Sequence, residues 1–402
     1  MGGAITGSSV ICAADAASIA AIRRRIHVYP ELCFEEQRTS ELIAKTLSDW
    51  DIPVYRGIGK TGVVGIIRGG PSNRAIGLRA DMDALPLTEQ NGFDHKSLER
   101  GKMHACGHDG HIAMLLAAAK YLANHRDFDG SIYLIFQPAE ESGGGAREMI
   151  KEGLFKRFPM DAIFGVHNWP GLPVGQFAVS SGPVFASNNE FRIRIRGKGA
   201  HAALPQEGID PVIVGCQMVL GFQAIITRNK RPADAGVLSV TIIHAGEAIN
   251  AVPDSCEIRG TVRSFTFDVL DLIESRMREI ADGICAAFKA TCDFEFHRNY
   301  PQTINHTKET AFVRNVLSTM AGDQNVLEFQ PTMGAEDFGF YLLEKAGCYF
   351  LIGNGDGDHR TTGHGAGPCM LHNPSYDFND ELISIGGTMW VRLVQGWFSQ
   401  TL

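Results

Sequence analysis

The stretch "SIYLIFQPAEESGGGAREMIKEGLFKRFPMDAIFGVHNW" (131–169) decides the fold class, because it places an apolar run on either side of a helix-like segment. We expect strands over 131–138 and 161–169, with a helix over 145–155 between them. Upstream, 75–81 reads as a further strand and 112–125 as a further helix. This alternation of strands and helices predicts an α/β fold with a mostly parallel sheet.

The pattern changes near residue 187, where apolar and polar residues alternate as in a strand with one solvated face. The following elements run in the order β-α-β-β-α-β, which is the ferredoxin-like α+β unit. Their expected ranges are 188–199, 210–228, 236–246, 256–265, 268–288 and 292–298. Helix and buried strand then resume over 308–322 and 347–355. We therefore expect a larger α/β domain, 1–186 plus 299–402, with a small domain inserted at 187–298.

The composition narrows the class of protein. The 402 residues include 37 Lys and Arg against 45 Asp and Glu, a net charge of −8, so we expect no nucleic-acid or anionic membrane partner. We expect no apolar run long enough to span a membrane, and residues 1–25 lack the basic start of a signal peptide. Nine cysteines without paired spacing indicate a reducing compartment, and we expect the cytoplasm.

The segment "MHACGHDGH" (103–111) carries four candidate metal ligands, which are His104, Cys106, His108 and His111. Because it precedes the helix expected at 112, we interpret it as a loop at a helix entrance. Imidazole together with a thiolate suits zinc, cobalt, nickel or iron better than calcium or magnesium. The alternative is a chance cluster on a solvated loop.

Three further groups are expected at the same edge of the sheet. Glu140 and Glu141 follow one strand directly and His167 ends the next, and ligands bind beyond the carboxyl ends of parallel strands. One carboxylate can ligate a metal while the other moves a proton, although an isolated Glu-Glu pair is more often a solvated turn. His372, in a proline-containing loop, is a plausible late ligand. Asp81 and Asp83 follow another strand and are possible hydrogen-bond partners of ligating histidines.

Seven motifs together resemble one known family. They are "RADMDALP", "MHACGHDGH", "QPAEE", "GVHNWP", "GKGAHAALP", "INAVPDSCEIRGTVRSF" and "MGAEDFGFYL". They are similar, in order and in spacing, to those of bacterial hippurate hydrolases and plant indole-3-acetyl-amino-acid hydrolases. These enzymes form a subfamily of the aminoacylase and carboxypeptidase G metallopeptidases. The resemblance runs from about residue 23 almost to the C-terminus.

The resemblance implies a catalytic domain with a two-metal centre and an inserted lid domain that often forms dimers. It implies metal ligands at Cys106, His108, Glu141, His167 and His372, with Cys106 bridging both ions and Glu140 as the general base. It also implies that the lid contributes His201, which reaches a partner subunit's site, and the carboxylate-binding residues Asn250 and Arg263. Where relatives have a histidine ligand, this sequence has Asp81. The metals are manganese, zinc, cobalt or nickel, and a homodimer or homotetramer is expected.

The implied function is metal-dependent hydrolysis of the amide bond of N-acyl-L-amino acids. A carboxypeptidase or dipeptidase with the same dinuclear centre is the close alternative. A metal-binding or redox-sensing protein would need the ligands but not Glu140, His201 or a carboxylate clamp. A structural protein on an inactive hydrolase fold would lack ligands, and none is missing from the sequence.

Overall fold

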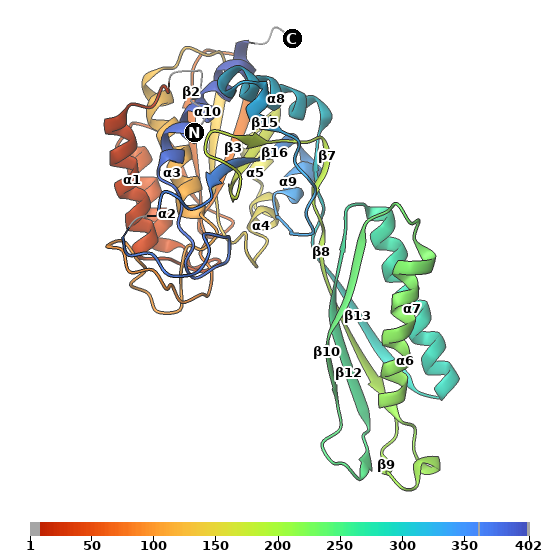
Figure 1. The fold of residues 1–402 in the computed structure, drawn as a ribbon. Coiled ribbons are helices and arrows are strands. Elements are labelled where there is room, and N and C mark those ends of the chain that lie inside the picture. Colours follow the sequence, from red (N-terminus) through yellow and green to blue (C-terminus); the bar gives the residue numbers. More distant parts are fainter. Residues whose placement is uncertain (1–8, 361, 400–402) are drawn as a thin grey trace. The chain divides into compact units, whose positions relative to one another are not determined.

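The computed structural model describes residues 9–360 and 362–399, so part of the N-terminal stretch examined above lies outside the described residues. The chain divides into two compact units (Figure 1). The first comprises Met1–Gly182, Ile304–Gln330 and Asp337–Leu402, and the second comprises Pro183–Thr303 and Pro331–Glu336. The short segment 331–336 clusters with the second unit although no sequence pattern assigned it there.

An eight-stranded sheet forms the centre of the first unit, in the order β1-β2-β4-β3-β5-β16-β6-β15. Its four neighbouring strands β4, β3, β5 and β16 run parallel to one another. This arrangement confirms the predicted α/β fold with a mostly parallel sheet. The strands are β1 (Val54–Ile58), β2 (Gly62–Arg68), β3 (Ala75–Asp81), β4 (Ser131–Gln137), β5 (Ala162–Pro170), β6 (Phe177–Ala178), β15 (Val326–Leu327) and β16 (Ala346–Gly355).

Helices cover this sheet, and α3 packs against both α1 and α10 (Figure 1). The core includes Leu115 and Leu116 of α3 and Trp390 of α10, all fully buried. The helices are α1 (Ala13–Val28), α2 (Gln37–Ser48), α3 (His108–Asn124), α4 (Gly145–Lys151), α5 (Leu154–Arg157), α8 (Thr307–Ala321), α9 (Gly339–Glu344) and α10 (Glu381–Ser399), with the 3-10 turn η3 (Asp323–Asn325).

Two expected helices differ in detail. Helix α3 begins at His108 rather than at 112, so His108 and His111 lie in its first turn and not in a loop. The sequence pattern predicts the start of this helix at its first apolar residue, whereas the polar residues "HDGH" before it already belong to the helix. The helix expected over 145–155 is split into α4 and α5, because Gly153 has φ 88° and interrupts it.

The second unit is a four-stranded antiparallel sheet, in the order β10-β12-β8-β13, with two helices. The chain order β8-α6-β10-β12-α7-β13 confirms the ferredoxin-like α+β fold. Its core joins Phe191 of β8, Met218 of α6 and Met277 of α7. The elements are β8 (Asn188–Arg196), β9 (Ala200–His201), η1 (Pro205–Glu207), α6 (Pro211–Ala224), η2 (Ile225–Asn229), β10 (Gly236–Ala245), β11 (Ala251–Val252), β12 (Ser255–Ser264), α7 (Phe267–Phe288) and β13 (Thr291–Tyr300). Two short strands, β7 (Gly182–Phe185) and β14 (Thr303–Asn305), lie where the chain passes between the units.

One helical stretch in the described residues, Pro211–Asn229, is long and apolar enough to cross a membrane by length and composition, with a mean hydropathy of 1.4. The expectation that no run reaches this length was therefore wrong. Asp210 caps the helix and accepts a hydrogen bond of 2.8 Å from the N–H of Val212. Val214, Met218 and Phe222 pack into the core of the second unit, as in a helix that covers a sheet.

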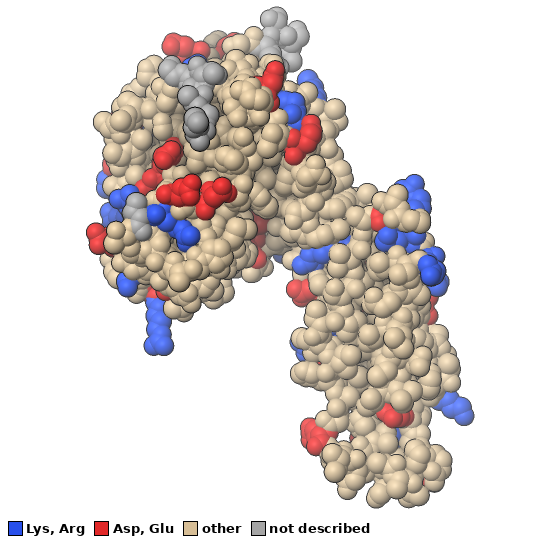
Figure 2. Space-filling model, in the orientation of Figure 1, with Lys and Arg blue, Asp and Glu red and all other residues tan. Residues whose placement is uncertain are grey.

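Positively and negatively charged side chains are intermixed on the face shown in Figure 2.

All nine cysteines are free thiols, and only some of them are buried.

Candidate active site

Cys106 lies directly before α3, in a loop held by side chains from distant parts of the chain. Gly107 has φ 91°, and a Cβ there would stand 2.3 Å from Nδ2 of Asn168 and 2.4 Å from the hydroxyl of Tyr376. Only glycine suits both the left-handed backbone and this close approach. Asn168 donates a hydrogen bond of 2.7 Å to the carbonyl of Cys106 and accepts one of 2.6 Å from Tyr376. The thiol is thereby fixed at the entrance of α3.

Two sets of ligand atoms meet at this thiol. The atoms of Cys106, His108 and His167 all lie within 4.8 Å of one another, and so do those of Cys106, Glu141 and His372. Cys106 Sγ lies 3.3 Å from His167 Nε2, and His372 Nε2 lies 3.3 Å from Glu141 Oε1. The structure thus brings together the five residues expected as ligands. Only Cys106 belongs to both sets, which is the position that a bridging ligand requires.

Each of these side chains comes from a different part of the first unit. His108 begins α3, Glu141 follows β4, and His167 lies within β5. His167 does not end its strand as expected, because β5 continues to Pro170. Since β4 and β5 belong to the parallel part of the sheet, their carboxyl ends meet at one edge.

The donor atoms fit a cation. Both ring nitrogens of His108 and Oε1 of Glu141 are buried without a well-directed hydrogen bond within the described part of the chain. Their nearest charged neighbours are other members of the cluster: His108 Nδ1 lies 3.3 Å from Asp83 Oδ1, and Glu141 Oε1 lies 3.3 Å from His372 Nε2. Buried polar atoms are normally paired, and unpaired ones need an explanation such as an ion. A thiol, three imidazoles and a carboxylate form a mixed S/N/O donor set, which suits divalent transition metals. The residues present therefore fit a metal centre.

The charges around these atoms also favour bound cations. Burial raises the pKa of the Cys106 thiol well above its usual value, and the carboxylates of Glu141 and Glu140 add to this effect. Burial disfavours the His108 imidazolium, but Asp81 and its neighbouring carboxylates outweigh burial and raise its pKa to about 10. These carboxylates concentrate negative charge in a buried space, and a metal ion there neutralises it and deprotonates the thiol.

His111 and Asp81 support the cluster from behind. His111 Nδ1 lies 2.6 Å from Asp81 Oδ1, and His111 Nε2 accepts a hydrogen bond of 3.0 Å from the N–H of Asn168. The imidazole is therefore neutral, with its proton on Nδ1. Asp81 Oδ2 accepts a hydrogen bond of 2.7 Å from Arg79, which is fully buried. Asp81 thus forms a hydrogen bond with His111, and its Oδ2 lies 3.6 Å from Nε2 of His108.

His104 has no comparable contact. Neither of its ring nitrogens has a hydrogen-bond partner among the described residues, and burial lowers its pKa to about 4. It is a neutral buried imidazole, and nothing in its surroundings assigns it a role.

Glu140 lies at the edge of the ligand cluster. Its carboxylate oxygen is within 4.8 Å of the ligand atoms of His108 and Glu141. Its Oε1 also accepts a hydrogen bond of 3.4 Å from the N–H of Asp337. The N–H groups of Glu140 and Glu141 each donate a hydrogen bond of 3.0 Å to a different oxygen of Asp83. This places Asp83 as the anchor of the turn that carries both glutamates.

The three lid residues do not lie together within the second unit. His201 in β9 pairs with Ala251 in β11, and Asn250 accepts a hydrogen bond of 3.0 Å from the N–H of Ala202. Arg263 lies at the other end of β12, next to Val237 in the sheet. Ser255 and Arg263 are eight positions apart along β12, which is about 26 Å at the usual rise. One lid therefore does not bring Arg263 to His201.

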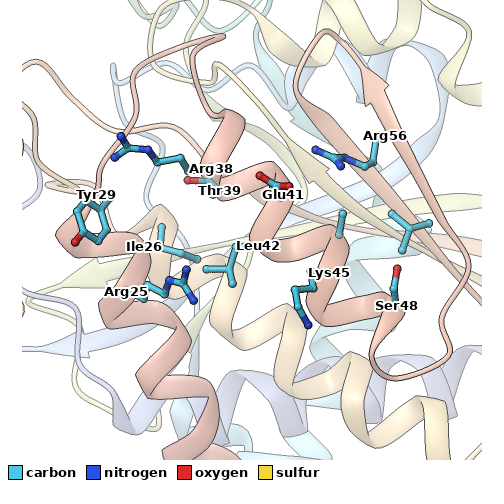
Figure 3. Close-up of a pocket in the computed structure, with 12 residues that line it drawn as sticks. Arg25, Ile26, Tyr29, Arg38, Thr39, Glu41, Leu42, Lys45, Ser48 and Arg56 are labelled. Atoms are coloured by element: carbon cyan, nitrogen blue, oxygen red, sulfur yellow. The ribbon is translucent and has the colours of Figure 1, made fainter.

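A groove on the first unit is drawn in Figure 3. It has a volume of about 860 Å³ and lies between α1 and α2. Basic side chains line it, among them Arg25, Lys45 and Arg56. None of the expected ligands or catalytic residues lines this groove.

Comparisons with known proteins show the family of the chain. The model of "Peptidase family M20/M25/M40" matches residues 77–396. The chain belongs to this family. It is 42% identical over 337 residues to Thermostable carboxypeptidase 1 of Saccharolobus solfataricus, covering 83% of this chain and 84% of the relative. It is 38% identical over 373 residues to the Hippurate hydrolase of Campylobacter jejuni, covering 92% of this chain and 94% of the relative.

A solved structure of the M20 family has the same fold. The YXEP protein of Bacillus subtilis, described as a dinuclear metal binding peptidase, superposes with a TM-score of 0.83 and 30% identity. The match covers 96% of this chain and 99% of the other. The resemblance to hydrolases expected from the motifs is thereby confirmed for the family and the fold.

For this M20 family member, sequence reasoning missed several residues that shape the site. Asn168 and Tyr376 hold the Cys106 loop, and Glu36 contacts the turn before Glu140. Asn168 directly follows the expected ligand His167, and this adjacency was the one available signal. Glu36 directly follows Glu35, and an acidic pair of this kind is normally expected on the solvated surface of a protein.

Proposed function

We propose that the chain hydrolyses the amide bond of N-acyl-L-amino acids at a centre of two divalent cations. The observation that carries this proposal is the pair of ligand sets that share Cys106, with Glu140 beside them. Membership of the M20 family and the dinuclear relative support two cations per subunit. Manganese, zinc, cobalt and nickel all suit the donor set, and we propose one of these four.

In the proposed reaction, Cys106 would hold both ions, with His108 and His167 as the further ligands of one and Glu141 and His372 as those of the other. When bound, such ions polarise the scissile carbonyl and lower the pKa of a water molecule toward neutrality. Glu140 accepts the proton of the attacking water and passes it to the leaving amine. A general base in this position is typically worth about 10²–10⁴ in rate.

The lid residues have proposed roles at the substrate. His201 donates a hydrogen bond to the oxyanion that develops on the carbonyl, and such donors act most strongly in the transition state. Asn250 and Arg263 bind the substrate's carboxylate, for which the planar guanidinium of Arg263 is suited. Because His201 and Asn250 lie together at the end of the lid sheet opposite Arg263, a complete site requires His201 and Asn250 from a second subunit.

Exposed apolar side chains on the second unit support a homodimer. Ile213 and Leu220 of α6 are exposed to 48% and 67%, although α6 is strongly apolar. Strand β10 is an edge of its sheet, and Ile242 and Ile243 on it are exposed to 38% and 50%. Exposed apolar patches beside an open strand edge are typical of association surfaces. We propose that this surface forms a homodimer, from which a tetramer can be built.

A carboxypeptidase or dipeptidase remains the second candidate, because the carboxypeptidase relative is as similar to the chain as the hippurate hydrolase.

The free thiols agree with the reducing cytoplasm that we propose as the location.

The deciding experiment is a substrate panel on apoprotein reconstituted with each of the four metals. Hippurate, N-acetyl-amino acids and dipeptides are assayed side by side. We expect kcat/KM to be highest for an N-acyl amino acid. A preference for dipeptides would favour the second candidate, and no hydrolysis with any metal would refute the proposal.

A further inference from the structure

Three consecutive backbone N–H groups in the turn after β4 donate to buried carboxylates. The N–H of Ala139 donates to Glu36 Oε1 at 2.9 Å, and those of Glu140 and Glu141 donate to Asp83 at 3.0 Å. Asp83 follows strand β3, as expected of a residue near the metal site. Glu36, by contrast, comes from the start of α2, more than a hundred residues before the turn.

Glu36 is fully buried and carries three hydrogen bonds. Besides Ala139, its Oε1 accepts from the N–H of Phe34 at 3.0 Å, and its Oε2 accepts from the hydroxyl of Thr61 at 2.6 Å. Among the described residues, it has no ion-pair partner. Burying a carboxyl group without a neighbouring cation is costly. We therefore expect the hydrogen bonds of Glu36 to have a structural role that offsets this cost.

Ala139 is the residue whose conformation Glu36 controls. It has φ 54°, in the left-handed region that is unfavourable for a non-glycine residue, and it is fully buried. Such a conformation persists only where the surroundings determine it. Its carbonyl accepts hydrogen bonds from the N–H groups of Gly143 and Gly145 at 3.2 and 3.0 Å. Its N–H and its carbonyl are thus both held, and the next residue, Glu140, leaves the turn in a fixed direction.

We propose that Glu36 is a positioning residue for the general base. Its carboxyl holds Ala139 in the left-handed conformation, and this aims the carboxylate of Glu140 at the ligand cluster. The inference rests on the proposed function, in which Glu140 accepts the proton. Glu36 touches none of the metal ligands, and the N–H groups of Glu140 and Glu141 keep their own hydrogen bonds to Asp83 when it is lost. We therefore expect its loss to act on the proton transfer far more than on substrate or metal binding.

A matched control lies in the segment that precedes the same helix. Glu31 also accepts hydrogen bonds from two backbone N–H groups and one threonine hydroxyl, those of Arg38 and Thr39, at 2.9 to 3.0 Å. These contacts hold the start of α2 and do not involve the turn at Ala139. Loss of either carboxyl removes the same kinds of hydrogen bond, so the comparison separates positioning from general stability.

The test compares Glu36→Ala, Glu36→Gln, Glu36→Asp and Glu31→Ala as metal-loaded full-length protein. The glutamine amide can accept from both N–H groups and donate to the oxygen of Thr61, so it should rescue function. We expect Glu36→Ala to lower kcat by about 10- to 100-fold, as misplacement of a catalytic group does, with KM and metal content unchanged. Glu36→Gln and Glu31→Ala should stay near the parent kcat. Glu36→Asp should be impaired, because its carboxylate is withdrawn by one methylene.

Hydrogen exchange gives a readout that does not need activity. In Glu36→Ala the amides of Ala139, Glu140 and Glu141 should exchange faster than in the parent, and in Glu31→Ala they should not. An unchanged kcat or exchange rate in Glu36→Ala, or an equal loss in Glu31→Ala, would overturn the inference. If Glu36→Ala does not fold, Glu36→Asp decides on the same measurements. A parent protein inactive on every substrate would refute the proposed function alone, since the exchange rates still test Glu36.

Discussion

The N–H of His372 donates a hydrogen bond of 2.8 Å to the carbonyl of Ala105, the residue before Cys106. His372 itself has φ 60°, a left-handed conformation for a non-glycine residue. This backbone contact joins a loop near the C-terminus to the cysteine loop. It places the imidazole 3.3 Å from Glu141 Oε1 although the side chain is 55% exposed.

Replacement of His372 by alanine should therefore remove one cation and leave the fold intact. The exposed side chain contributes little packing, whereas one of two ligand sets loses a member. We expect the metal content after gel filtration to fall from two toward one per subunit, with the melting temperature of the apoprotein unchanged. His125→Ala, an exposed histidine at the end of α3, is the control and should keep both ions. Two tightly held ions in His372→Ala would contradict its role.

Glu140→Gln should keep both metals and lose nearly all turnover. Glutamine is nearly isosteric but cannot accept the proton, so we expect kcat to fall by about 10²–10⁴. Metal content by mass spectrometry and kcat on the best substrate are the two measurements. Substantial activity in this variant would end the assignment of Glu140 as the base.

The stability of the protein should depend on pH through Glu36. Burial raises the pKa of Glu36 to about 7, although the hydrogen bond from Thr61 acts in the opposite direction. A raised pKa means that the folded protein binds this proton more tightly than the unfolded chain does. Its contribution to stability is therefore fully present below about pH 4.5 and is lost as pH rises through 7.

The glutamine in Glu36→Gln cannot titrate, whereas the parent loses stability as Glu36 deprotonates. The free energy of unfolding of Glu36→Gln minus that of the parent should therefore increase between pH 5 and pH 8. The change should be on the order of 2–3 kcal/mol, from roughly 1.4 kcal/mol per unit of pKa shift. Denaturant unfolding at both pH values measures it. A difference between the two proteins that is the same at pH 5 and pH 8 would refute the shifted pKa.

Mixing two inactive variants should restore activity if the lid serves the neighbouring subunit. A dimer of His201→Ala and Glu140→Gln protomers contains one site with both an intact Glu140 and a His201 from its partner. Random mixing after mild denaturation should recover about a quarter of the parental rate, since half of the dimers then carry one such site. No recovery in confirmed mixed dimers would place His201 at the site of its own subunit.

The sequence predicted the sheet and the inserted unit well, because their signals are local. Apolar runs such as 131–138 and the cap at Asp210 are set by a few neighbouring residues. The start of α3 was misplaced, since His108 and His111 are polar residues buried in the first turn of a helix. Tertiary contacts decided that turn, and no periodicity in the sequence reports them.

The complete ligand set was assigned only through resemblance to a family, although the sequence alone had placed Cys106, His108, Glu141 and His167 near one edge of the sheet. Spacing gave Cys106 and His108, but nothing local marks His372, whose position depends on one backbone contact with Ala105. Glu36 was not predictable, because an acidic pair at a helix start is normally solvated and only the folded chain shows its contact with Ala139.

The central claim is that Cys106 bridges two cations, and anomalous X-ray diffraction of crystals of the metal-loaded protein tests it most directly. We predict two anomalous peaks per subunit, both within bonding distance of Cys106 Sγ, about 2.3 Å for zinc. One peak should also contact His108 and His167, and the other Glu141 and His372. A single peak, or two peaks of which either lies away from the sulfur, would contradict the account.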